Sequence, residues 1–126
     1  GILSILSKKR RLPHMRDLNH AYFTGHLTSD VRHFQTLDTK NGAEFTLGVN
    51  DEWHDANGQP QKRTDYIGVI CYGHITATAL KLQKGDSVVV TGKMRNEDVP
   101  LAGGKTERKT KLRALHLATH REIKPQ

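Results

Sequence analysis

The feature of this sequence that most constrains its fold is a series of short β-forming segments, each bounded by turn residues. Over residues 43–49, apolar residues alternate with polar residues or glycine, which is the period of a strand with one buried and one open face. Residues 65–72 and 87–94 are rich in β-branched and aromatic residues. Together these segments predict an all-β barrel or sandwich.

The remaining elements complete a five-stranded order with one helix. Residues 21–27 are expected to form the first strand, with extended structure resuming over 31–34, and residues 108–118 the fifth. Ile75, Ala79 and Leu82 recur at helical spacing, which predicts a helix over residues 75–82. Five strands with one short helix between the third and the fourth form a five-stranded OB-fold barrel.

Polar segments between these strands are expected to form the connections. Residues 38–42 end in Asn-Gly, a pair that tolerates positive φ, so we expect a turn there. Residues 55–64 and 99–106 are polar or rich in glycine and proline, and we expect each to form a long loop, the first of them a projecting hairpin loop.

Length and charge indicate how the chain is organised. The chain has 126 residues, enough for one domain, which we expect over residues 18–120. Residues 1–17 are expected to be an N-terminal extension, either a tag or a flexible basic tail, and residues 121–126 a short tail. The net charge is +7, but residues 17–104 carry a net −3, so the positive charge lies mainly on the tails and the last strand.

Several classes of function lack support in the sequence. A membrane span needs about 18 consecutive apolar residues, and no such run occurs. The single cysteine, Cys71, excludes an intrachain disulfide and a four-cysteine zinc site, and it fits the reducing cytoplasm. The histidines are not spaced as zinc ligands are. Residues 55–58 resemble the start of a calcium-binding loop, but no bidentate glutamate follows at the required distance. We therefore expect no metal and no cofactor. No catalytic triad order, phosphate loop or dinucleotide motif is present, so we expect no enzymatic activity.

Three aromatic residues are candidates for binding nucleic acid bases. Tyr66 and Tyr72 share one face of the predicted third strand, and Gly68 between them leaves room for a flat base. Trp53 stands among polar residues at the entry to the first long loop. A base stacked on an exposed ring contributes about 1–3 kcal/mol. The alternatives are that the tyrosines pack in the core and that Trp53 caps the mouth of the barrel.

Basic residues near these rings are candidate phosphate contacts. They lie in the two long loops, after the fourth strand and along the fifth, where we expect them to form a groove beside the aromatic face. The alternative is ordinary solubilising charge. The set consists of Lys62, Arg63, Lys93, Arg95, Lys105, Arg108, Lys109 and Lys111.

Five fragments of the chain, in order and at matching spacing, resemble the bacterial single-stranded DNA-binding proteins. The resemblance extends over about residues 19–118. The fragments are YFTGHLTSD (22–30), FTLGVNDEW (45–53), TDYIGVICYG (64–73), LQKGDSVVVTG (82–92) and KMR (93–95).

This resemblance implies sequence-nonspecific binding of single-stranded DNA, which protects single strands in replication, recombination or repair. It implies that Trp53, Tyr66 and Tyr72 stack on bases while basic residues follow the phosphates. It also implies a homo-oligomer, a tetramer or dimer paired through the first strand, and a cytoplasmic, nucleoid-associated location.

The sequence departs from the family pattern at two places. Val99 stands where a fourth ring is usual, which implies weaker binding or a shorter footprint. The acidic C-terminal tip that recruits replication and repair proteins is replaced by the basic residues 121–126, which implies either that the tail was removed or that the chain is a short, specialised paralogue. Three other functions stay open at this point: a primosome-type OB protein-interaction module with secondary nucleic-acid affinity, an RNA-binding or tRNA-binding OB protein, and a metal-dependent nuclease.

Overall fold

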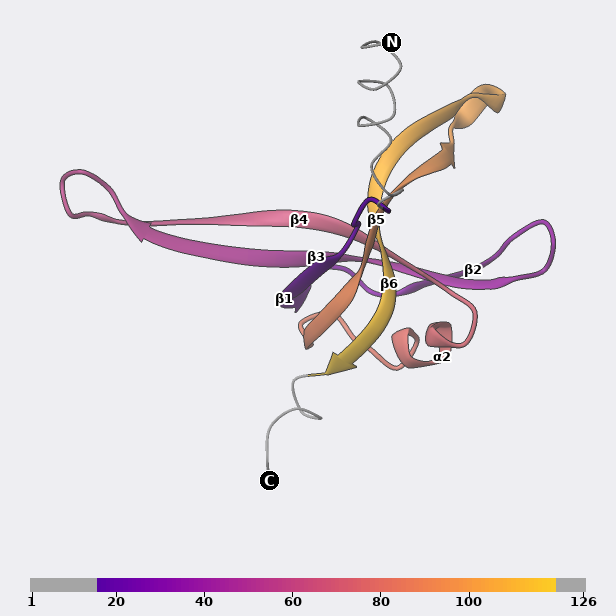
Figure 1. Cartoon of the computed structure of the whole chain (residues 1–126), viewed down its shortest axis with the longest axis horizontal. Helices are drawn as coiled ribbons and strands as arrows, with labels where there is room; N and C mark the ends of the chain where they lie inside the picture. The colour runs from indigo at the N-terminus through magenta and orange to yellow at the C-terminus, as the bar shows by residue number, and fades with distance from the viewer. Residues whose placement is uncertain (1–15, 120–126) are drawn as a thin grey trace, which may run out of the picture.

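The computed structural model describes residues 16–119, which form six strands, one short α-helix and one 3-10 turn (Figure 1). Most of the expected N-terminal extension and all of the expected tail 121–126 lie outside the described residues. The elements are β1 (Ala21–Leu27), β2 (Arg32–Gln35), β3 (Asn41–His54), β4 (Pro60–Tyr72), α2 (Ile75–Ala79), β5 (Ser87–Pro100), η1 (Ala102–Gly104) and β6 (Thr106–Thr119).

Five of the strands close into a barrel. Their order is β1-β5-β6-β4-β3, and β1 closes the barrel by pairing with β3 through His26 with Gly48 and Leu27 with Leu47. The pairing of β4 with β6 is parallel, and the other pairings are antiparallel. The short strand β2 pairs with β3 beyond β1 on the same edge. With α2 between β4 and β5, this is the predicted five-stranded OB-fold barrel.

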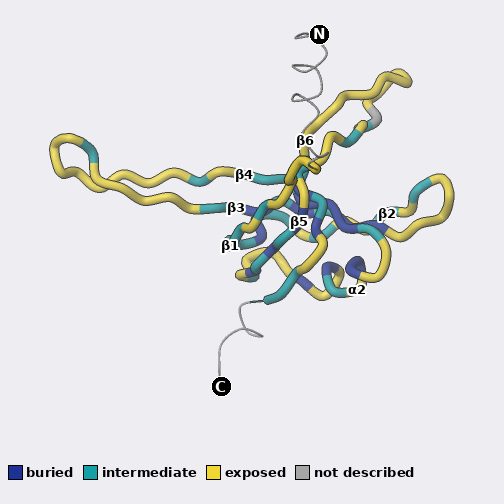
Figure 2. Tube along the Cα trace, viewed as in Figure 1, coloured by how far each residue is buried: buried dark blue, intermediate teal, exposed yellow. Residues whose placement is uncertain are grey.

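The core of the barrel consists of the alternate residues that point inward from each strand. Figure 2 shows that buried residues gather in the barrel and around α2, whereas the long hairpins that project from the barrel are mostly exposed. Ile75 and Ala79 of α2 are buried in the same cluster as Leu82, as their helical spacing predicted, although the helix ends at Ala79. The largest fully buried side chains are Leu27, Leu47, Leu112, Val69, Val88, Val90 and Cys71.

Two long hairpins project from the barrel, and here the predicted loops were wrong in extent. Strands β3 and β4 pair without interruption as far as His54 and Pro60, so residues 60–64 are strand and the tip is residues 55–59. Strands β5 and β6 likewise pair as far as Pro100 and Thr106. We call these hairpins the β3–β4 arm and the β5–β6 arm. Both faces of an arm are exposed to solvent, so its sequence lacks the apolar alternation that reveals a half-buried strand.

The turn predicted at residues 38–42 lies earlier than expected. The left-handed residue is Thr39, with φ 65°, while Asn41 and Gly42 already belong to β3. Gly42 is needed for a different reason, because a Cβ there would collide with the ring of Phe34 on the neighbouring strand β2. The glycine therefore serves ring packing rather than the turn.

Candidate nucleic-acid interface

The candidate site lies on the outside of the barrel, on a surface formed by four strands. Val69 and Cys71 of β4 point into the core, so the residues between and beside them point outward. Cross-strand contacts and register bring residues of β3, β6 and β5 onto the same surface. We call this surface the outer face, and its members are Glu44, Tyr66, Gly68, Ile70, Tyr72, Lys93, Arg95, Glu97, Lys109, Lys111 and Arg113.

Tyr66 and Tyr72 share the outer face but have different surroundings. Tyr66 is 67% exposed, which confirms the prediction that at least one of the two rings is open to solvent. Tyr72 is half-buried, because the guanidinium of Arg113 lies 4.9 Å above its ring and Phe34 meets it edge-on, with 5.9 Å between centroids. One side of the Tyr72 ring is therefore covered.

The Tyr72 hydroxyl points toward an acidic neighbour. It donates to Oε2 of Glu97 at 3.4 Å. Burial raises the pKa of Tyr72, and the negative charge of Glu97 raises it further. The phenol therefore stays a neutral donor, tied to β5.

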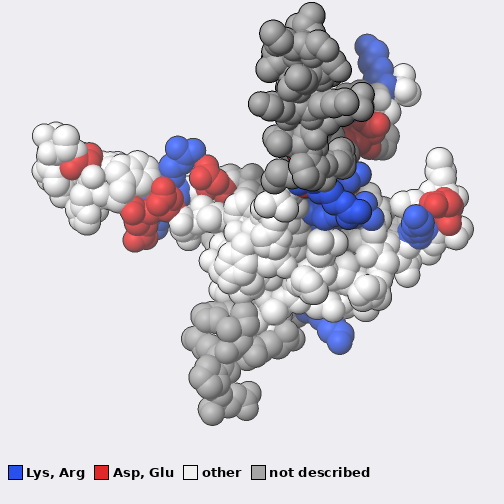
Figure 3. Space-filling model, viewed as in Figure 1, with Lys and Arg blue, Asp and Glu red and all other residues white. Residues whose placement is uncertain are grey.

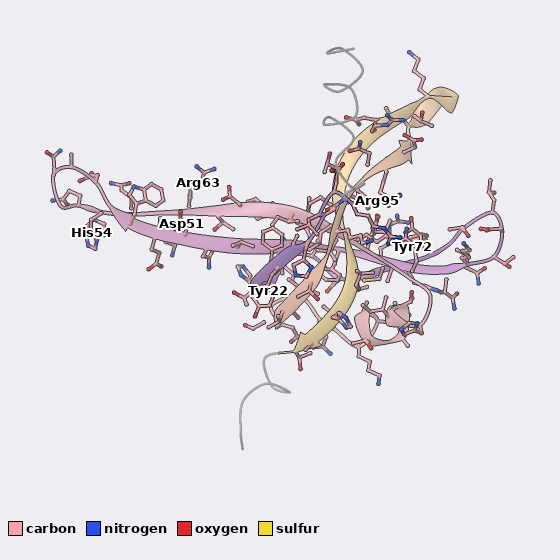
Figure 4. The ribbon with its side chains drawn as sticks, in the orientation of Figure 1. Tyr22, Asp51, His54, Arg63, Tyr72 and Arg95 are labelled. Atoms are coloured by element: carbon pink, nitrogen blue, oxygen red, sulfur yellow. The ribbon has the colours of Figure 1, made fainter. Side chains whose placement is uncertain are left out.

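Trp53 lies on the β3–β4 arm, between Asp51 and His54, which Figure 4 labels far out along the arm. It is 42% exposed and is paired with Gln61 across the arm. It is not among the residues that form the core or pack on it, so the alternative of a cap on the barrel mouth was wrong. The pairing of β3 with β4 has no bulge, so Trp53 lies on the opposite side of the arm from Tyr66.

The predicted basic residues do not form one continuous cluster. Figure 3 shows basic side chains grouped at the foot of the β5–β6 arm, where Figure 4 labels Arg95 and Tyr72. Lys109 and Lys111 lie on this outer face, whereas Arg108 faces the other side of the arm and pairs with Asp98 at 3.5 Å. Lys105 lies next to η1, at the tip of the β5–β6 arm.

Ion pairs engage part of the basic set. Besides Arg108, Arg63 pairs with Asp65 at 2.8 Å and Lys109 approaches Glu107 at 4.0 Å. Lys111 pairs with Glu44 at 3.1 Å. Within residues 16–119, the members without an ion pair are Lys62, Lys93, Arg95 and Lys105.

The space predicted above Gly68 is occupied. The side chain of Lys111 crosses it, and a Cβ built on Gly68 would lie 3.5 Å from Cγ of Lys111. A flat base reaches the backbone here only if the Lys111 side chain moves aside, so the approach expected from the sequence stays a prediction.

The set of site residues predicted from the sequence leaves out four residues at this site: Arg32, Phe34, Glu44 and Arg113. Arg32 lies 5.3 Å from the centroid of the Phe34 ring, and its Nε donates to Oε1 of Glu44 at 2.8 Å. The register of β2 against β3 creates these contacts, and nothing in the sequence sets that register. For Arg113 the sequence did contain a signal, because Arg113 is an even number of residues from Lys109 and Lys111 and therefore points to the same side of the strand.

Glu44 is a carboxylate held between two cations. Partial burial raises its pKa, but hydrogen bonds from Arg32 and Lys111 outweigh this and hold the pKa below its usual value. The group is therefore a firmly ionised anion within a basic surface.

Residues 55–58, which resemble the start of a calcium-binding loop, form a turn. Oδ1 of Asp55 accepts hydrogen bonds from the backbone N–H groups of Asn57 and Gln59, both at 2.9 Å. Oδ2 accepts from Nε2 of Gln61 at 3.1 Å. Across the described residues, no three His, Cys, Asp or Glu side chains are arranged to hold a metal ion. The same part of the chain contains no helix long and apolar enough to cross a membrane.

Comparison with known proteins identifies a family and several relatives that this chain resembles. Residues 18–120 match the profile of the single-strand binding protein family. Single-stranded DNA-binding protein 1 of Chlorobaculum tepidum is 27% identical over 81 residues, covering 64% of this chain and 50% of the relative. The single-stranded DNA-binding protein of Thermus aquaticus is 28% identical over 102 residues, covering 81% and 38%. The chain thus spans half the length, or less, of these two relatives.

Two solved structures share the fold. A Plasmodium falciparum SSB in complex with ssDNA superposes with a TM-score of 0.70 at 19% identity, covering 84% of this chain and 97% of that one. A deletion mutant of the Thermus aquaticus protein gives 0.68 at 22% identity, covering 81% and 50%.

Proposed function

Because the chain belongs to the single-strand binding protein family, we propose that it binds single-stranded DNA without sequence preference and protects it in replication, recombination or repair. The observation that carries the proposal is the outer face, where the exposed ring of Tyr66 lies on the same surface as Lys93 and Arg95 of β5, which make no ion pair with the described residues. Rings stack on any base and cations attract phosphates, so this combination holds a strand without reading its sequence. The family match favours this function over a protein-interaction module.

Within this proposal the residues have two roles. Tyr66 and Trp53 stack on bases, and Tyr72 does so together with Arg113, whose planar guanidinium stacks on bases as a ring does. The basic side chains contact phosphates. These contacts come from Lys62, Arg63, Lys93, Arg95, Lys105, Arg108, Lys109 and Lys111, together with Arg113.

The proposal extends to assembly and location. The protein is a homo-oligomer, a dimer or tetramer in which β1 strands pair, and it acts in the cytoplasm without catalysis. The open ring of Tyr22 on β1, 62% exposed, is consistent with a contact made there. The binding domain is residues 18–120. Light scattering gives a mass above the 14.2 kDa of one chain if this is right, and a mass of one chain contradicts it.

A competition experiment tests the binding function. Fluorescein-labelled oligo-dT is titrated with the protein, and its anisotropy is followed at low salt. Unlabelled single strands of any sequence should displace the label at similar concentrations, while duplex DNA and a matched RNA displace it poorly. Displacement by duplex as readily as by single strand would contradict the proposal.

A further inference from the structure

The structure contains an anion at the place where a bound strand would need cations. Glu44 lies on β3 within the outer face, opposite Ile70 of β4. Its carboxylate accepts hydrogen bonds from Nε of Arg32 at 2.8 Å and from Nζ of Lys111 at 3.1 Å. We call Arg32, Glu44 and Lys111 the Glu44 cluster.

The cluster lies on the path between the two tyrosines. Tyr66 and Tyr72 are six residues apart on one strand, about 20 Å at the rise of an extended chain. Gly68 and Ile70 are the outward positions between them, and Lys111 crosses Gly68 while Glu44 pairs with Ile70. A strand that stacks on Tyr66 and continues to Tyr72 must therefore pass over the cluster.

A hollow in the surface is lined by all three members of the cluster. The other residues that line it come from the β1–β2 connection, β3, β4 and β6, and they include Asp30 and Lys109. The Glu44 side chain is 24% exposed and so already reaches solvent, while the Lys111 side chain is only 17% exposed. Glu44 therefore already borders open solvent on the side of the hollow.

A phosphate would suit the same two cations. Carboxylates and phosphates both present oxygen acceptors to the fork of an arginine and to an ammonium group. While Glu44 holds Arg32 and Lys111, its carboxylate offsets one of their two positive charges, which weakens the attraction of this part of the surface for a polyanion.

From this geometry we propose that Glu44 stands in for a DNA phosphate in the free protein and yields Arg32 and Lys111 to the strand on binding. This inference rests on the proposed binding of single-stranded DNA. Part of the binding free energy is then spent on releasing Glu44, so Glu44 limits the affinity of the protein for DNA. The residue sets binding strength without touching the base.

Three variants test this role: Glu44→Gln, Glu52→Gln and Glu44→Gln combined with Lys111→Gln. Glu52 is the matched control because it lies on the same strand and the same side of it, is exposed, and makes no ion pair with the described residues. Affinity for oligo-dT is measured by anisotropy over a series of salt concentrations, and each variant is checked by thermal unfolding.

Glu44→Gln should bind oligo-dT about fivefold more tightly at low salt, the size expected from removing one partly exposed competing ion pair. Its logarithmic salt dependence should stay close to that of the unmodified protein, because Arg32 and Lys111 contact the phosphate in both complexes. Glu52→Gln should raise the affinity less. In the Lys111→Gln background the gain from Glu44→Gln should largely disappear, because one of the released cations is absent.

Two results would overturn the inference. One is a folded Glu44→Gln protein whose affinity is unchanged or reduced, which would assign Glu44 a structural role over Ile70. The other is an equal gain from Glu52→Gln, which would show a general effect of net charge. If the unmodified protein fails to bind oligo-dT at all, the proposed function itself is refuted, and this inference with it.

Discussion

Tyr66 and Tyr72 occupy the same side of one strand, yet their rings differ in what a DNA base could reach. Tyr66 is open to solvent, whereas Arg113 and Phe34 pack against Tyr72 and its hydroxyl is bound to Glu97. A substitution of Tyr66 should therefore affect binding, and a substitution of Tyr72 should also affect the stability of the fold.

Tyr66→Ala should lose about 1–3 kcal/mol of binding free energy for oligo-dT, the value of one stacked base. Its melting temperature should stay near that of the unmodified protein, because an exposed side chain adds little to the core. Tyr66→Phe is the control, since it keeps the ring and should keep the affinity. An affinity unchanged in Tyr66→Ala would remove this ring from the binding surface.

At the scale of the single residue, Glu44 should also make the stability of the fold depend on pH. Its pKa in the folded protein lies below the usual value, so its pairing stabilises the fold above the unfolded-state pKa and is lost as the pH falls through the folded pKa. The difference in free energy of unfolding between the unmodified protein and Glu44→Gln should therefore be larger at about pH 6 than at about pH 3. Urea unfolding at the two pH values measures it, and a difference independent of pH would contradict the pairing.

At the scale of elements, the β5–β6 pairing contains an irregularity at the end of the barrel part of β5. The register shifts between Thr91 and Gly92, and Gly92 is the last residue of β5 that pairs with β1. A Cβ on Gly92 would collide with the backbone carbonyl of Arg113, and a backbone group cannot rotate away as a side chain can.

Gly92→Ala should consequently destabilise the fold by about 2 kcal/mol or more, as overpacking against fixed atoms does. Gly68→Ala is the matched control, because it also lies in an extended strand but its Cβ would make an ordinary contact with Lys111. Thermal unfolding of the two variants compares them. Equal melting temperatures would show that the backbone approach at Gly92 is looser than the structure indicates.

The elements also show what could be predicted from sequence. Alternation revealed β3 within the barrel, and helical spacing revealed the buried side of α2, because each has one side in the core. The arms escaped prediction because polar residues such as those at 60–64 pair through their backbones and leave no apolar pattern. The exposure of Tyr66 could be foreseen, but the contact of Lys111 with Glu44 joins residues 67 positions apart and depends on strand order and register.

At the scale of the whole molecule, the two arms and the outer face determine how a strand could be held. Trp53 lies on the β3–β4 arm, Tyr66 lies nearer the barrel, and the basic group lies at the foot of the β5–β6 arm. Because Trp53 lies on the opposite side of the β3–β4 arm from Tyr66, a strand that contacts all three would pass round that arm as well as across the barrel. Its affinity should depend on both stacking and charge.

Trp53 is the only tryptophan of the chain, so its fluorescence reports directly on this account. Oligo-dT added at low salt should quench the emission in a saturable manner, and added salt should restore it, with a logarithmic slope of about 0.7 for each phosphate neutralised. Emission that stays unchanged at saturating oligo-dT and low salt would contradict the claim that this chain holds single-stranded DNA by stacking.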